Sequence, residues 1–430
     1  MHHHQIKNRL RYTTQSAAQR QTTSNELGSA FTLTNGQVIK NRLFKSAMSE
    51  QLGTNDHNPT DGLAKLYERW AQGGIGLSIT GNIMVDRNAL GEPKNVVLDE
   101  QSDLTNFKKW AQAGLKNNSQ IWPQLNHPGK QIPNFICDEP VSPSAIPLTG
   151  GLEKGFNKPR ALTEVEIYEI INKFALSAKL SKQAGFSGVQ IHGAHGYLVS
   201  QFLSPRHNQR DDQWGGSLEN RMRFVLAIYH AIREEVGSDF PIGIKLNSAD
   251  FMKGGFTEDD SMEVVKALAT AGIDLIEISG GTYESPSMVG HKVKESTLKR
   301  EAYFLDYIEK VRKIVDTPLV LTGGFRSSNA MQAALDSGAT DFIGVARTTA
   351  VDPDFPNKLI SDKSHKQELR ILTSGVKAVD KMAMFDIVWY EFQLARMAKG
   401  VAPKPSLGEW GVFFKTLASA GMYAFKKRRA

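Results

Sequence analysis

The segment QAGFSGVQIHGA, residues 183–194, joins the end of a helix, a glycine, a short link and an apolar strand that finishes in small and polar residues. Three other segments follow the same plan: QGGIGLSITGN at 72–82, TAGIDLIEISGG at 270–281 and DSGATDFIGVAR at 336–347. Their glycines fit the left-handed position that closes a helix, where a Cβ would clash; they are Gly74, Gly185, Gly272 and Gly338. Helix–strand units repeated in this order indicate a parallel sheet.

Further apolar runs lie in the gaps between these units. They occupy residues 42–48, 120–125, 241–246 and 318–322 and bring the expected strands to eight. Helix starts fall between strands: Thr163 with Glu166 makes a capping box, and Thr257 precedes an acidic first turn. This alternation predicts an α/β fold, a TIM (β/α)₈ barrel. A doubly wound sheet is the weaker alternative, because no G-x-G-x-x-G follows an early strand.

The chain is expected to have three parts. Residues 1–30 are polar and lack periodicity, which predicts an N-terminal arm. Residues 31–363 hold the barrel. Residues 364–430 predict a C-terminal helical extension, with a long helix at 364–399 and an aromatic-rich one at about 407–425.

The extension is too aromatic to remain solvated, and three placements are open. It covers its own barrel, forms a homodimer contact, or lies on a membrane surface with the basic residues 426–429 at the headgroups. It does not predict a membrane span, because it lacks the roughly 18 uninterrupted apolar residues that a span needs.

Composition excludes several classes of protein. The formal net charge of the 430 residues is +7, but no groove-reading motif accompanies it, so we expect no nucleic-acid partner. The single cysteine, Cys137, excludes an intrachain disulfide and an iron–sulfur cluster held by four cysteines of this chain. It also favours a reducing compartment, so we expect a cytoplasmic protein. The N-terminus has no apolar signal segment, and His2–His4 imply no metal site.

Titratable residues crowd the stretch VQIHGAHGYLVSQFLSPRHNQRDDQWGGSLENRMRF, residues 189–224. His192 and His195 follow the end of a buried strand, with Tyr197 just behind them. Together the two imidazoles could bind a carbonyl or phenolate oxygen; alternatively, each is a loop histidine satisfied by backbone groups. Buried polar atoms without partners cost free energy, so such a cluster at a strand end indicates a site. A second titratable ring at His195 would let pH tune anion binding.

Other strand ends carry polar residues of the same kind. Lys245 lies within the apolar run PIGIKLNS, and Gln124 lies in PQLNHPGKQ. The strand at 318–322 is followed by Gly323 and Gly324, and Arg347 follows the last strand. In (β/α)₈ barrels the active site lies at the carboxyl ends of the strands, and phosphate is commonly bound after the seventh and eighth. The residues after Thr322 and Val345 therefore predict a phosphate site.

The joint pattern resembles the Old Yellow Enzyme family of FMN-dependent NAD(P)H:flavin oxidoreductases and ene-reductases. The resemblance covers roughly residues 30–360 and rests on the histidine pair, the tyrosine two residues later, and the W-G-G-S-x-E-N-R run at 214–221. We expect that run to be structural, with Ser217 capping a helix. Many members of the family carry Asn in place of His195 and Arg in place of Lys245.

The resemblance implies a role for each candidate residue. His192 and His195 would bind the substrate oxygen, and Tyr197 would supply a proton. Noncovalently bound FMN would contact Lys245 at its N1/C2 edge, Gln124 at its pyrimidine ring and Ser49 near its C4 oxygen. Backbone contacts to the flavin ring and phosphate complete the set: Ala47, Met48, Gly81, Gly323, Gly324 and Ala346, with the Arg347 side chain.

The implied activity is reduction of activated alkenes, enones and nitroalkenes, with hydride from NAD(P)H passed through FMN and a proton from Tyr197. Two alternatives come from other classes of protein. One is a lyase that forms a Schiff base at Lys245. The other is a non-catalytic flavin-binding scaffold that uses its C-terminal helices for partners. The sequence leaves open the substrate, the choice between NADH and NADPH, and the oligomeric state.

Overall fold

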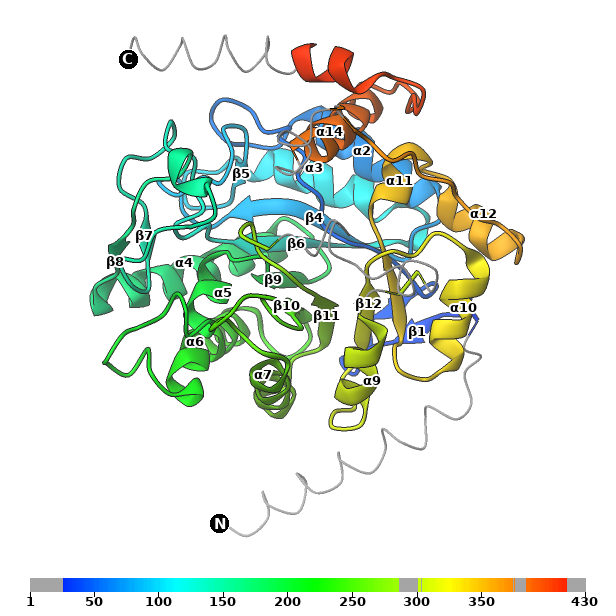
Figure 1. Cartoon of the computed structure of the whole chain (residues 1–430). Coiled ribbons are helices and arrows are strands. Elements are labelled where there is room, and N and C mark those ends of the chain that lie inside the picture. Colours follow the sequence, from blue (N-terminus) through cyan, green and yellow to red (C-terminus); the bar gives the residue numbers. More distant parts are fainter. Residues whose placement is uncertain (1–25, 286–300, 303, 374, 376–383, 416–430) are drawn as a thin grey trace.

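A closed barrel of parallel strands forms the centre of the molecule (Figure 1). The computed structural model describes residues 26–285, 301–302, 304–373, 375 and 384–415. Its barrel strands are β3 (Leu43–Lys45), β4 (Leu77–Met84), β6 (Gln120–Asn126), β9 (Val189–Gly193), β10 (Ile242–Asn247), β11 (Leu275–Ser279), β12 (Leu319–Thr322) and β13 (Phe342–Val345). Because β3 pairs in parallel with both β13 and β4, the sheet closes. The predicted TIM barrel is confirmed.

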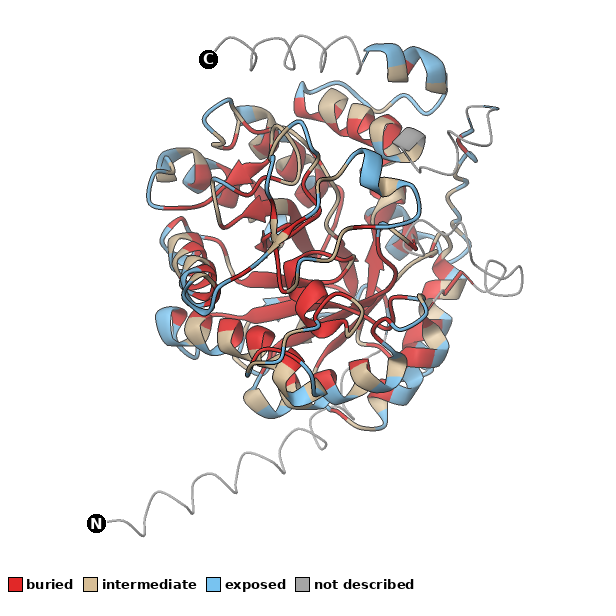
Figure 2. Ribbon diagram, turned by 60° about the vertical axis from the view of Figure 1, so that its left-hand side comes forward, coloured by how far each residue is buried: buried red, intermediate tan, exposed pale blue. Residues whose placement is uncertain are grey.

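Helices surround the barrel and turn their buried faces toward it (Figure 2). Those that connect successive strands include α2 (Asp61–Gln72), α3 (Leu104–Gly114), α4 (Glu164–Gln183), α6 (Leu218–Val236), α7 (Glu258–Ala271), α9 (Leu305–Arg312) and α10 (Ser328–Asp336). The predicted caps are present, since Thr163, Ser217 and Thr257 each accept a backbone hydrogen bond at a helix start. The four repeat glycines have φ between 73° and 99°, as the repeat predicts.

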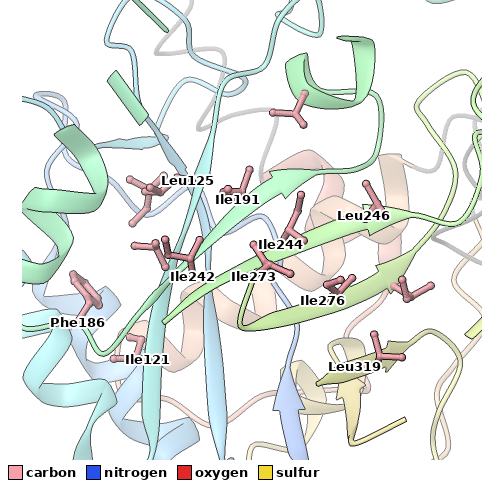
Figure 3. Close-up of a cluster of buried hydrophobic side chains, with 14 of the residues drawn as sticks. Ile121, Leu125, Phe186, Ile191, Ile242, Ile244, Leu246, Ile273, Ile276 and Leu319 are labelled. Carbon is pink, nitrogen blue, oxygen red and sulfur yellow. The ribbon is translucent and has the colours of Figure 1, made fainter. Parts of the chain in front are cut away.

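Alternation along each strand separates two apolar layers. Outward side chains pack against the helices and include Ile121, Leu125, Ile191, Ile242, Ile244, Leu246, Ile276 and Leu319 (Figure 3). Inward side chains at the strand starts form an apolar floor: Phe44, Leu77, Ile79, Trp122, Leu275, Val320 and Phe342. Leu33 and Ile39, from the hairpin of β1 (Phe31–Thr32) and β2 (Val38–Ile39), close this floor from below. Polar groups inside the barrel must therefore lie toward its carboxyl end.

The arm and the extension both reach the barrel. Residues 1–25 lie outside the described residues, but Leu27 is buried and its backbone N–H donates to Gln332 Oε1. In the extension, α14 (Met384–Ala398) packs on α2 and on α11 (Arg347–Val351), with Trp389 and Leu394 buried. This helix therefore covers the outside of its own barrel.

The predicted long helix at 364–399 is wrong at its beginning. Residues 364–373 are not helical, and backbone groups at 365–367 pair with residues 326–328 instead. Lys366 forms a bridge with Ser327, and the Gln367 N–H donates to the Arg326 carbonyl. The second helix is described at 409–415, and the rest of its predicted range lies outside the described residues. Across the described part of the chain, no helix has the length and apolar character needed to cross a membrane.

Candidate functional site

A belt of buried polar side chains lies directly above the apolar floor. Gln124 donates to Gln190 across neighbouring strands at 2.8 Å, and Gln190 donates to Glu277 Oε2 at 2.8 Å. The other Glu277 oxygen accepts from Thr322 at 2.9 Å and lies 3.3 Å from Lys245 Nζ. Since a buried carboxylate needs such partners, the belt fixes the Lys245 ammonium and both amides in place.

The predicted residues Gln124 and Lys245 therefore meet inside the barrel, and two partners were not predicted. Gln190 lies two residues before His192 on β9 and therefore on the same strand face. Glu277 was missed, although it interrupts the apolar strand LIEIS of β11 in the way that Lys245 interrupts β10. The same argument about a charge inside an apolar strand would have identified it.

The histidine pair lies at the carboxyl end of β9. His192 is opposite Lys245 in the register of β9 and β10, and its ring centroid is 5.2 Å from that of His195 at an interplanar angle of 86°. His195 Nε2 is 2.8 Å from Ser279 Oγ, and its backbone N–H donates to Asn247 Oδ1 at 3.2 Å. The Ser279 hydroxyl thus holds the His195 ring and Asn247 holds its backbone, beside the His192 ring, as a binding pair for one oxygen requires.

Charge and burial keep both imidazoles neutral. Burial, then the neighbouring His195 and Lys245, lower the pKa of His192 well below 6.5; burial and Lys245 do the same for the pKa of His195. The expectation that His195 would tune anion binding through its own titration near neutral pH is therefore wrong for this arrangement. Each neutral ring still offers one N–H donor.

Tyr197 stands beside the pair, at the start of α5 (Leu198–Leu203). Its ring contacts His192 edge-on, with centroids 4.8 Å apart, and its hydroxyl is 2.7 Å from that of Tyr283. Burial and the nearby Glu92 raise the pKa of Tyr197 to about 12, against the opposing effect of hydrogen bonds with Tyr283 and Asn82. The phenol therefore keeps its proton at neutral pH, which a general acid requires.

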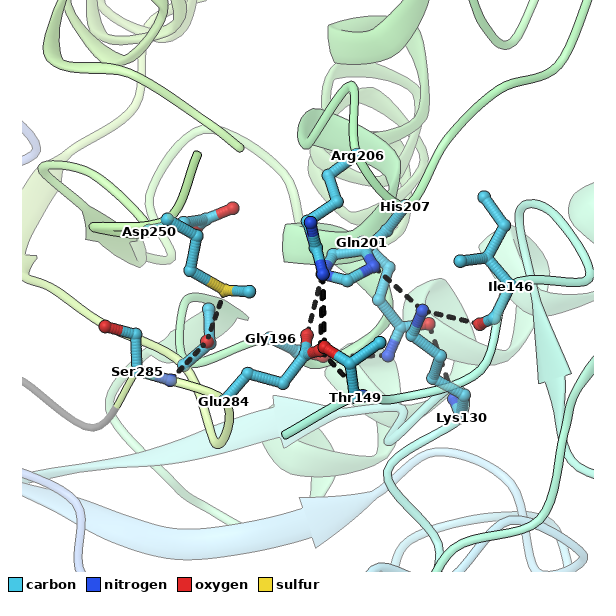
Figure 4. A network of polar contacts seen from close by, with 12 residues as sticks. Lys130, Ile146, Thr149, Gly196, Gln201, Arg206, His207, Asp250, Glu284 and Ser285 are labelled. Carbon is cyan, nitrogen blue, oxygen red and sulfur yellow. Dashed lines mark hydrogen bonds and ion pairs between the residues drawn. The ribbon is translucent and has the colours of Figure 1, made fainter. Parts of the chain in front are cut away.

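A buried carboxylate anchors the loop that carries Tyr283. Glu284 accepts hydrogen bonds from the backbone and hydroxyl of Thr149, and its Oε2 lies 3.2 Å from His207 Nε2 (Figure 4). Lys130 Nζ extends this network to His207 Nδ1 and the Ile146 carbonyl, both at 2.8 Å. Burial alone would raise the pKa of Glu284, but His207 and Thr149 lower it to about 2. The network joins three loops beside Tyr197, those that carry Thr149, His207 and Glu284. The sequence did not predict this connection.

The residues after β3 form another edge of the site. Ala47, Met48 and Ser49 are half-buried. A Cβ on Gly81 would lie 2.6 Å from the Met48 carbonyl oxygen, so only glycine fits there. The structure thus explains Gly81 through close packing on this segment, and its contact with the flavin ring stays a prediction.

The predicted phosphate residues lie together because β12 and β13 are neighbours. Gly323 and Gly324 have φ of 125° and 89°, conformations that bring backbone N–H groups close to a ligand. Ala346 and Arg347 are half-buried beside them. Among the described residues, the Thr348 hydroxyl is buried without a hydrogen-bond partner. Backbone donors, a cation and a spare hydroxyl fit an FMN phosphate, as the belt amides and Lys245 fit the flavin ring.

Comparisons with known proteins identify the family of this chain. A family model described as the NADH:flavin oxidoreductase / NADH oxidase family matches residues 28–366. The chain is 38% identical over 353 residues to the NADH-dependent flavin oxidoreductase iliE of Hypocrea jecorina (strain QM6a), covering 76% of this chain and 87% of that protein. It is 34% identical over 408 residues to the NADH-dependent flavin oxidoreductase iccE of Talaromyces variabilis, covering 87% and 98%.

A solved structure supports the fold. The Old Yellow Enzyme homologue from Zymomonas mobilis matches with a TM-score of 0.68 and 24% identity over 80% of this chain and 95% of that one. The resemblance drawn from the histidine pair and its surroundings is confirmed, and the chain belongs to the NADH:flavin oxidoreductase / NADH oxidase family.

Proposed function

We propose that this FMN-dependent oxidoreductase takes hydride from NADH and reduces alkenes activated by a carbonyl or nitro group. The observation that carries the proposal is the group of three side chains at the end of β9. Two neutral imidazoles, His192 and His195, stand beside a phenol, Tyr197, that stays protonated. Such a reduction needs two contributions from the protein: hydrogen-bond donors for the carbonyl or nitro oxygen, and an acid that protonates the α-carbon.

The histidines polarise the substrate. Two N–H groups directed at one carbonyl or nitro oxygen withdraw electron density from the conjugated double bond, so the β-carbon becomes the electrophile. When bound, FMN supplies the hydride for that carbon. Ser279 holds the His195 ring and Asn247 holds the His195 backbone, so this donor needs little reorganisation as negative charge grows on the oxygen.

Tyr197 delivers the proton that completes the reduction. A phenol with a pKa of about 12 is a weak acid, but the α-carbon of an enolate is a strong enough base to accept its proton. A hydrogen bond from Tyr283 to the phenolate oxygen would stabilise the charge left behind. Tyr283 thus supports Tyr197 and does not replace it.

The belt organises the flavin side. Lys245 brings a positive charge toward the edge where reduction of the flavin places negative charge, and Gln124 offers an amide to the pyrimidine ring. Glu277 lies against Lys245, so this cation is partly balanced within the protein. The ion pair also argues against the Schiff-base lyase, because a lysine must lose its proton to attack a carbonyl.

A non-catalytic flavin scaffold is distinguished by turnover. Such a protein would be yellow and would pass electrons to no alkene, whereas the proposed enzyme oxidises NADH in the presence of an enone or nitroalkene. The cytoplasmic location remains a proposal, as does a homodimer formed through the C-terminal helices, where Trp410 and Phe414 are exposed. Light scattering of the intact protein tests the dimer.

We expect the purified protein to be yellow and to release FMN, not FAD, on denaturation. The grounds are one phosphate-sized site at the ends of β12 and β13 and no dinucleotide fingerprint in the sequence. Chromatography of the released flavin against both standards decides it. FAD, or no flavin after reconstitution, would remove the basis of the proposed function.

We expect Lys245→Met to weaken FMN binding and to slow flavin reduction by NADH, because it removes the cation beside the reduced ring. It also leaves Glu277 buried without its counter-ion, and breaking a buried pair costs about 3–5 kcal/mol. Titration with FMN and stopped-flow reduction measure the first two effects, and thermal unfolding measures the third.

The matched control is Lys245→Met combined with Glu277→Gln, which restores neutrality inside the barrel. It should recover much of the stability while FMN affinity and reduction rate stay low. Unchanged flavin affinity and an unchanged reduction rate in the single variant would place Lys245 away from the flavin.

A further inference from the structure

Two carboxyl groups share one hydroxyl at the exit of β3. Ser49 Oγ lies 2.6 and 2.7 Å from the two Glu92 oxygens and 2.6 Å from Glu391 Oε1. A serine hydroxyl has a single hydrogen to donate, so it satisfies one carboxylate only. Contacts this short to both groups require that one carboxyl carries a proton and donates it to Ser49.

Glu391 is the better place for that proton. Burial and then Glu92 raise the pKa of Glu391 to about 8, although the contacts with Ser49 and Gln51 oppose the shift. Glu92 is titratable too, and burial raises its pKa while Ser49 and Asn95 oppose that change. Tyr283, from the loop after β11, interacts electrostatically with both Glu92 and Glu391. The two carboxyl groups therefore lie near the hydrogen-bonded hydroxyls of Tyr197 and Tyr283. Glu92 and Tyr283 are both acids, so neither supplies the positive charge that would favour an ionised Glu391.

Glu391 belongs to the C-terminal extension. It lies on α14, beyond residues 28–366 that the family model matches. Trp389 and Leu394 bury this helix against the barrel, and Gln393 fixes the turn that follows by bonding the backbone N–H and carbonyl of Lys404. Gln51 Nε2 adds contacts of 3.0 and 3.2 Å to the Glu391 carboxyl. A separate segment of chain thus reaches the edge of the flavin site.

We propose that Glu391 is a positioning residue of the flavin site, which docks α14 onto the barrel and orients the Ser49 hydroxyl. As the protonated partner it donates to Ser49 Oγ, which leaves the serine hydrogen for an acceptor on its other side, Glu92 or the flavin edge. The placement of Ser49 beside that edge rests on the proposed function, whereas the docking of α14 does not.

The direction of the pH dependence follows from the proton. The folded protein binds it up to about pH 8, whereas an unfolded glutamate loses it near 4.5. Docking is therefore tightest below pH 4.5 and weakens as the pH rises toward 8, since over that interval only the folded state keeps the proton. The raised pKa of Glu92 acts in the same direction.

The test uses the full-length, FMN-loaded protein and the variants Glu391→Gln and Glu391→Ala between pH 6 and 9.5. Hydrogen exchange of residues 384–398, corrected for intrinsic rates, reports docking, and the flavin absorption spectrum and reduction potential report Ser49. Glu368→Gln is the matched control. Glu368 is an exposed acid of the same C-terminal segment, and among the described residues its one ion pair is with Lys366.

We expect protection of α14 in the wild type to fall at least about tenfold as the pH rises from 6 to 8 and to level off above 8, because each pH unit between the two pKa values is worth about tenfold. Glu391→Gln should be protected at least as well as the wild type at pH 6 and lose the pH response, because the amide keeps a donor toward Ser49 and does not titrate. Glu391→Ala should lose protection at every pH. The Glu368 control should behave as the wild type.

Identical pH profiles for the wild type and Glu391→Gln, or loss of protection in Glu391→Gln at pH 6, would overturn the protonated contact. If protection follows the prediction while flavin spectrum and potential ignore every Glu391 variant, the orienting role toward the flavin is overturned. Failure to bind FMN at all refutes the proposed function instead, and the exchange measurement on the apoprotein still decides whether α14 docks through Glu391.

Discussion

Tyr197→Phe is expected to slow alkene reduction by about 10²–10⁴-fold, the usual contribution of a general acid, and to leave flavin reduction by NADH nearly intact. The substitution removes only the hydroxyl, which lies 2.7 Å from that of Tyr283. The ring and its edge-on contact with His192 remain. Since NADH gives up hydride without a proton from this residue, only the second half-reaction should suffer.

Stopped-flow measurement of the two half-reactions separates these effects. Tyr307→Phe is the matched control, because Tyr307 is also buried and hydrogen-bonded, but to Ser261 behind the barrel wall. Its loss should change stability and not the ratio of the two rates. Equal slowing of both half-reactions by Tyr197→Phe, or of neither, would exclude Tyr197 as the proton donor.

The double variant His192→Ala, His195→Ala is expected to abolish the long-wavelength charge-transfer band that simple phenols give when bound as phenolates over the oxidised flavin. Hydrogen bonds to charged groups contribute about 1.5–3 kcal/mol each, so losing two should weaken phenol binding on the order of 10²-fold or more. FMN should stay bound, because its expected contacts come from other strands.

Titration of each protein with a phenol, followed in the visible spectrum, measures this. His230→Ala is the control, since His230 is exposed on α6 and lies outside the site. Because both pKa values in the pair are lowered, the pH dependence of binding should follow ionisation of the phenol rather than of the protein. A band that persists in the double variant would place the anion site elsewhere.

The sequence determined the barrel because its signals are local. Strand alternation, left-handed glycines such as Gly185 and caps such as Thr163 act within a few residues, so they can be read without knowing the fold. The same holds for His192 and Lys245. Parallel strands end at one edge of a barrel, and polar residues at those ends must therefore meet.

Tertiary structure alone decided the contacts that cross the barrel or join distant segments. Gln190 and Glu277 are 87 residues apart and meet only because the sheet closes, and Tyr283 reaches Tyr197 because the Glu284 carboxylate anchors its loop. Such partners leave no periodic signal in the sequence.

The C-terminal segment depends most strongly on contacts with residues that are distant in the sequence. Residues 364–373 read as helix by composition, yet backbone groups at 365–367 pair with residues 326–328 at the start of α10, because long-range hydrogen bonds outweigh a weak local preference. Glu391 looks like one of many acids on a helix surface. Only the packing of α14 on α2 and α11 brings it 2.6 Å from Ser49, 342 residues earlier in the chain, where the shared proton gives it a role.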